Sequence, residues 1–77
     1  MSANLVDVTI HIDETLTLDQ QNEIETMIRE ANGVVGVGHR KERAHLFIIE
    51  YDPDVINSSE ILEVVKSSGV HAELIGL

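Results

Sequence analysis

The sequence predicts an α+β domain in which four short strands form an antiparallel sheet and two helices cover one of its faces. Three observations lead to this prediction. The chain opens with a strictly alternating apolar segment, carries two segments with apolar residues at helical spacing, and has two short apolar runs between them. With 77 residues and 43% hydrophobic content the chain can bury one small core, so we expect a single domain over residues 1–77.

Residues 6–13 predict the first strand and residues 17–33 the first helix. Apolar side chains at every second position indicate a strand with one buried face: Val6, Val8, Ile10 and Ile12. Thr17 followed by Gln20 is typical of a capping box at a helix start, and Gly33 is a natural helix stop. The buried side of this helix is expected to carry Ile24, Met27, Ile28 and Ala31.

Residues 34–39 and 45–51 predict a β-hairpin whose register follows from its two faces. Setting Val37 opposite Phe47 places both on the core side, and on the other face each glycine of the first strand then lies opposite a large aliphatic residue. The remaining pairs are then Val35 with Ile49, Gly38 with Leu46, Gly36 with Ile48, and His39 with His45.

The C-terminal third predicts a turn, a helix and a last strand. Asp52-Pro53-Asp54 indicates the turn, and Asn57 with Glu60 three residues later predicts another capped helix that Gly69 ends. Residues 70–77 complete the sheet. The order strand, helix, strand, strand, helix, strand, with right-handed crossovers, predicts the ferredoxin-like βαββαβ plait.

Composition excludes several classes of function. A net charge of −9 disfavours nucleic acid and anionic membranes as partners, and the absence of cysteine rules out thiolate metal sites and disulfides. The basic group Arg40, Lys41 and Arg43 is expected to be a solvated turn. We expect no enzymatic activity, because the sequence has no nucleophile–base set and no phosphate-binding loop. Without a signal peptide or membrane span, a cytoplasmic protein is expected.

One set of residues keeps a joint spacing along most of the chain: Ile24, Ile28, Ala31, Gly33-Val34, Tyr51-Asp52-Pro53 and Gly69-Val70-His71-Ala72. By these residues the chain resembles, over residues 6–74, the heavy-metal-associated (HMA, copper-chaperone-like) domain family. It implies the plait fold. The two metal-binding cysteines of the family's CxxC motif fall on Thr17 and Gln20, and its loop methionine on Thr15. Thr and Gln are poor ligands for copper(I), so the copper chemistry of the family does not carry over.

All four histidines map to one end of the predicted sheet. His39 and His45 would be cross-strand partners, and His11 and His71 would lie on neighbouring strands of the helix-free face. Either imidazole pair is a candidate site for zinc, nickel or copper(II), with Asp13 or Glu14 adding a carboxylate. A pH-dependent contact and a simple gathering of polar residues at strand ends are the alternatives.

The helix-free face is the candidate protein interface. It is expected to present Leu5, Thr9, His11, Leu46, Ile48 and Ile75. An exposed aliphatic patch of this kind marks a partner or dimer surface, unless it merely covers the bare backbone of neighbouring glycines. We therefore expect a small, non-enzymatic binding domain without an obligatory cofactor that acts on a protein partner or as a homodimer. The alternative is a carrier or sensor of zinc, nickel or copper that uses the histidines.

Overall fold

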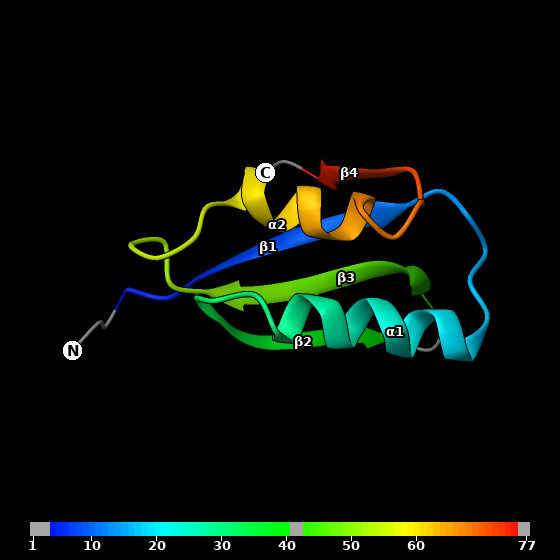
Figure 1. Cartoon of the computed structure of the whole chain (residues 1–77), viewed down its shortest axis with the longest axis horizontal. Coiled ribbons are helices and arrows are strands. Elements are labelled where there is room, and N and C mark those ends of the chain that lie inside the picture. Colours follow the sequence, from blue (N-terminus) through cyan, green and yellow to red (C-terminus); the bar gives the residue numbers. More distant parts are fainter. Residues whose placement is uncertain (1–3, 41–42, 76–77) are drawn as a thin grey trace.

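The four-stranded sheet carries both helices on one face, as predicted (Figure 1). The computed structural model describes residues 4–40 and 43–75, and not the side chains of residues 39, 40, 43 and 44. Its elements are β1 (Val6–Ile12), α1 (Leu18–Arg29), β2 (Val34–Arg40), β3 (Arg43–Tyr51), α2 (Ser58–Lys66) and β4 (Ala72–Ile75). The strands are antiparallel in the order β2-β3-β1-β4, which confirms the ferredoxin-like plait. No helix in the described ranges is both long and apolar enough to cross a bilayer.

The core lies between the helices and one face of the two central strands. Even-numbered residues of β1 and odd-numbered residues of β3 point toward the helices, because side chains alternate along a strand. The fully buried large side chains are Ile10, Ile12, Ile28, Phe47, Ile49, Ile61 and Val65. Burying each of these contributes about 1.5–3 kcal/mol, so they supply most of the stabilisation. We call the opposite side of the sheet, which neither helix covers, the open face.

Both helices begin with the predicted capping boxes. The Thr17 hydroxyl accepts from the Gln20 backbone N–H at 3.1 Å, and the Gln20 side-chain oxygen accepts from the Thr17 N–H at 2.8 Å. Asn57 and Glu60 make the same reciprocal pair at 2.8 and 3.0 Å. Two otherwise unpaired N–H groups are satisfied at each helix start.

The predicted hairpin register is wrong by two residues. Val37 lies opposite Ile49 and Gly38 opposite Ile48. A slip of two keeps each side chain on its predicted face, because the side-chain period of a strand is also two. Val35 is an exception: a bulge between Val34 and Gly36 leaves its side chain 57% exposed, where a core position was predicted.

A second irregularity lies near the hairpin end. His39 is opposite Phe47 and Arg40 is opposite Arg43, so β2 advances by one residue while β3 advances by four. The predicted pairing of His39 with His45 is therefore wrong, and residues 44–46 are released from the regular alternation with β2.

Two predicted segments reach beyond the described residues. Lys41 and the side chains of Arg40 and Arg43, which form the basic group, lie outside them. The described last strand spans Ala72–Ile75, shorter than the predicted 70–77, and Gly76 and Leu77 lie outside the description.

Two glycines with positive φ offer a matched test of the packing. A Cβ on Gly33 (φ +103°) would lie 2.8 Å from a methyl of Ile56 and 2.9 Å from one of Val55, whereas a Cβ on Gly69 (φ +95°) would meet nothing within 4 Å. Both alanine substitutions strain the backbone, by about 1–2 kcal/mol. Gly33→Ala adds an overpacking cost of about 1–3 kcal/mol.

Urea unfolding should therefore show Gly33→Ala as the more destabilised variant by at least about 1 kcal/mol. Equal losses for Gly33→Ala and Gly69→Ala would contradict the close packing of the β3–α2 turn under Gly33.

Candidate functional site

The centre of the open face is a row of residues that crosses all four strands. Gly38 lies opposite Ile48, Ile48 opposite Thr9, and Thr9 opposite Ile75. Ile48, in the middle of β3, is 43% exposed, and Ile75, the last residue of β4, is 40% exposed. Of the other predicted interface residues, Leu46 lies opposite His11 in the next row, and Leu5, 41% exposed, precedes β1. The structure thus brings five of the six predicted interface residues to one side of the sheet: Thr9, His11, Leu46, Ile48 and Ile75.

Two glycines leave the β2 edge of this face without side chains. A Cβ built on Gly36 or Gly38 would meet no atom within 4 Å, and neither residue has a positive φ. Glycine in a strand costs about 0.5–1 kcal/mol relative to alanine. Gly36 adjoins the bulge after Val34, which accounts for that glycine. Gly38 is required neither by packing within the chain nor by backbone conformation.

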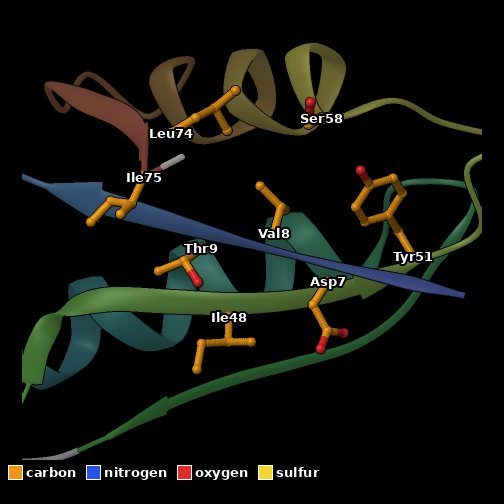
Figure 2. A pocket seen from close by; sticks show the side chains of 8 residues that line it. All are labelled: Asp7, Val8, Thr9, Ile48, Tyr51, Ser58, Leu74 and Ile75. Carbon is orange, nitrogen blue, oxygen red and sulfur yellow. The ribbon is translucent and has the colours of Figure 1, made fainter. Parts of the chain in front are cut away.

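A shallow hollow of about 530 Å³ opens along β1, at the edge of the open face (Figure 2). Thr9, Ile48 and Ile75 line it from the open face, while Tyr51 and Leu74 line it from the helix side. The remaining lining residues are Asp7, Val8 and Ser58.

The described charges of the open face are acidic. Asp7, Glu50 and Glu73 are exposed on strands of this face, around the central row. The two described Lys and Arg side chains lie on the helices instead, where Arg29 pairs with Glu25 and Lys66 with Glu63. The described open face is therefore an aliphatic centre with a negative rim.

Two histidines meet at one end of the sheet, in a pairing that the sequence did not predict. The rings of His11 and His45 are stacked, with centroids 5.8 Å apart and planes 21° apart. Nδ1 of His45 donates to the Ile12 carbonyl at 2.7 Å, and Nδ1 of His11 lies 3.2 Å from a carboxylate oxygen of Asp13. The release of residues 44–46 from the β2 ladder explains how His45 reaches His11.

His71 is held by Glu14 at the same end. Its ring Nδ1 lies 2.7 Å from Glu14 Oε2, and its backbone N–H donates to both carboxylate oxygens at 2.9 and 3.1 Å. The Asp13 N–H also donates to the His71 carbonyl at 2.8 Å. These contacts, which we call the Glu14–His71 clamp, tie the loop after β1 to the start of β4.

Neither predicted histidine pair is formed as predicted. His11 stacks on His45, His71 is engaged by Glu14, and the side chain of His39 lies outside the described residues. Among the side chains that the structure describes, which exclude that of His39, no group of three or more His, Asp or Glu is arranged to hold a metal ion.

The Glu14–His71 clamp gives a pH-dependent contribution to stability. The side-chain hydrogen bond that the His71 ring donates to the Glu14 carboxylate raises the pKa of His71 above its ordinary 6.5. The side-chain and backbone hydrogen bonds from His71 lower the pKa of Glu14 below its ordinary 4.5. The histidine term is fully present below pH 6.5 and is lost as pH rises through the raised pKa. The glutamate term is present above pH 4.5 and is lost as pH falls through the lowered pKa.

We therefore expect the stability difference between wild type and Glu14→Gln to be largest between pH 4.5 and 6.5. NMR titration of the His71 ring should show its pKa falling toward the ordinary value in Glu14→Gln. A His71 pKa that is the same in both proteins would contradict the clamp.

Comparison with known proteins gives a clear result for the fold. The sequence matches no protein-family model and no curated protein. Solved structures match closely in shape. A putative copper-ion-binding protein from Bacillus anthracis aligns with a TM-score of 0.82 at 21% identity, covering 94% of this chain and 100% of its own. Oxidized MerP from Ralstonia metallidurans CH34 aligns with a TM-score of 0.82 at 13% identity, over 92% and 97% of the two chains.

A third similar structure is the N-terminal domain of a potential copper-translocating P-type ATPase from Bacillus subtilis, solved in its Cu(I)-loaded state. Its TM-score is 0.82 at 20% identity, and the alignment covers 92% of this chain and 88% of that one. At such identities the likeness establishes a shared fold. The chain described here shares the fold of these structures, and its sequence contains no cysteine.

Proposed function

We propose that this chain is a non-enzymatic protein-binding domain that docks a partner on its open face. The observation that carries the proposal is the bare β2 backbone at Gly38, beside an isoleucine, Ile48, that is 43% exposed. Glycine within a strand is typical of a place where another backbone or a ligand approaches closely. A partner seated there would bury Ile48 and Ile75. Its close approach would account for a glycine that lowers the stability of the strand.

Thr17 and Gln20 occupy the metal-binding positions of the heavy-metal-associated family, and what they do here supports a role other than copper(I) transfer. In this chain Thr17 and Gln20 satisfy each other's backbone N–H groups at the start of α1. Their side-chain oxygens are thereby committed to the helix cap. Protein recognition without thiol chemistry is the role that the remaining surface fits.

The charge of the open face favours a basic partner over a second copy. Two copies facing each other would bring Asp7, Glu50 and Glu73 of each near like charges, on a chain of net charge −9. A partner with a bulky apolar side chain inside a ring of Lys or Arg would complement the aliphatic centre and its negative rim.

Substitutions on the face should remove binding without unfolding the domain. Gly38→Val places a β-branched side chain in open space, so its free energy of unfolding should be unchanged or raised by up to about 1 kcal/mol. The same side chain would block close approach of a partner. Ile48→Asp should weaken binding at least about tenfold, or ~1.4 kcal/mol.

The test compares four immobilised proteins as baits for the basic partner, at low and at high salt. They are wild type, Gly38→Val, Ile48→Asp and the control Leu18→Asp. Leu18 is 68% exposed on α1, away from the open face. We expect a basic protein to be retained by wild type and Leu18→Asp, lost with the two face variants, and released by salt. Retention that Gly38→Val and Ile48→Asp leave intact would contradict the proposal. Self-association that persists in sedimentation at low salt and is abolished by Gly38→Val would instead identify a second copy as the occupant.

A further inference from the structure

We propose that His11 and His45 form a two-imidazole binding site for a divalent transition-metal ion, with copper(II) bound most tightly. The site lies at the histidine end of the sheet, where His11 adjoins the open face, and it differs from the loop positions Thr17 and Gln20. The motivating observation is the stacked pair of rings, with centroids 5.8 Å apart, at the end of the central strands.

The contacts of both rings leave one nitrogen of each available. A backbone carbonyl can only accept, so the bond from His45 to Ile12 requires the hydrogen on Nδ1 of His45. The Asp13 carboxylate beside Nδ1 of His11 favours the same tautomer. In a neutral imidazole with its hydrogen on Nδ1, the lone pair is on Nε2. Anchoring of one ring nitrogen by a carboxylate or a carbonyl is the arrangement that surrounds metal-binding histidines.

The ring separation suits a shared ion. Metal–nitrogen bonds of about 2.1 Å place the centroids of two imidazoles on one ion about 5–6 Å apart, close to the separation observed here. The terminal torsion of a histidine is broad, so small rotations that keep both Nδ1 contacts cost little. His11 keeps 36% of its side chain exposed and His45 is only partly buried, which leaves the pair reachable from solvent.

Two protein ligands define an open site. The absence of a third suitable His, Asp or Glu among the described residues leaves the remaining coordination positions to water or to a ligand from outside the chain. Imidazole suits copper(II), nickel(II) and zinc(II), and affinity rises from nickel to copper. An exchangeable ion is therefore expected, in contrast to a permanently held structural metal.

The test is calorimetric titration of the tag-free full chain with copper(II), nickel(II) and zinc(II) chlorides in a weakly coordinating buffer. The variants are His11→Ala, His45→Ala, Asp13→Asn and His71→Ala. We expect one ion per chain, copper tightest, and a loss of at least about tenfold for either alanine variant of the stacked pair. Asp13→Asn should also lose about tenfold, because it removes the carboxylate that orients His11. His71→Ala should bind as wild type does.

A second readout is independent of affinity. In two-dimensional spectra of the imidazole nitrogens, nickel(II) should broaden the His11 and His45 signals together at substoichiometric amounts. Far-UV circular dichroism of each variant verifies that the domain is folded. Unchanged affinity in the His11→Ala and His45→Ala variants, or a loss confined to His71→Ala, would overturn the proposal.

Discussion

The alternation of buried and exposed side chains along β1 and β3 is the constraint on which the rest of the molecule depends. Ile10 and Ile12 of β1 and Phe47 and Ile49 of β3 lie beneath the helices and are fully buried. Their neighbours are forced to the opposite side, because successive side chains point to opposite faces. The open face is thus a direct consequence of the core. What is particular to this chain is the content of that face: isoleucines, acidic residues and two glycines.

At one end of the sheet, hydrogen bonds fix the loop that follows β1. At the end that carries the histidines, the loop after β1 is fixed by the capping box of Thr17 and Gln20 and by the Glu14–His71 clamp. The stacked rings of His11 and His45 lie at this same end. The protein-binding proposal concerns the middle of the open face, and the metal-binding proposal concerns the histidines at its end.

The fold and the faces of the strands were predictable because they follow from local patterns. Periods of two and 3.6 and the two capping boxes define the elements and their buried sides. The predicted hairpin register differs from the observed one by two residues. Alternation of buried and exposed side chains cannot reveal this shift, because the shift equals one period of the alternation. Val35 and His45 were misplaced for a shared physical reason: each lies at an irregularity of the β2–β3 ladder, where alternation fails. Stacking of His45 on His11 depends on that irregularity and carries no signal in the sequence.

The nine isoleucines report directly on the assignment of the two sheet faces. Methyl NMR of the monomer with a soluble paramagnetic agent measures the exposure of each one. The account predicts strong attenuation of the Ile48 and Ile75 methyl signals only, since the other seven isoleucines are at most 8% exposed. Protection of Ile48 together with attenuation of Ile49 would show that the helices cover the other face, and would contradict the account.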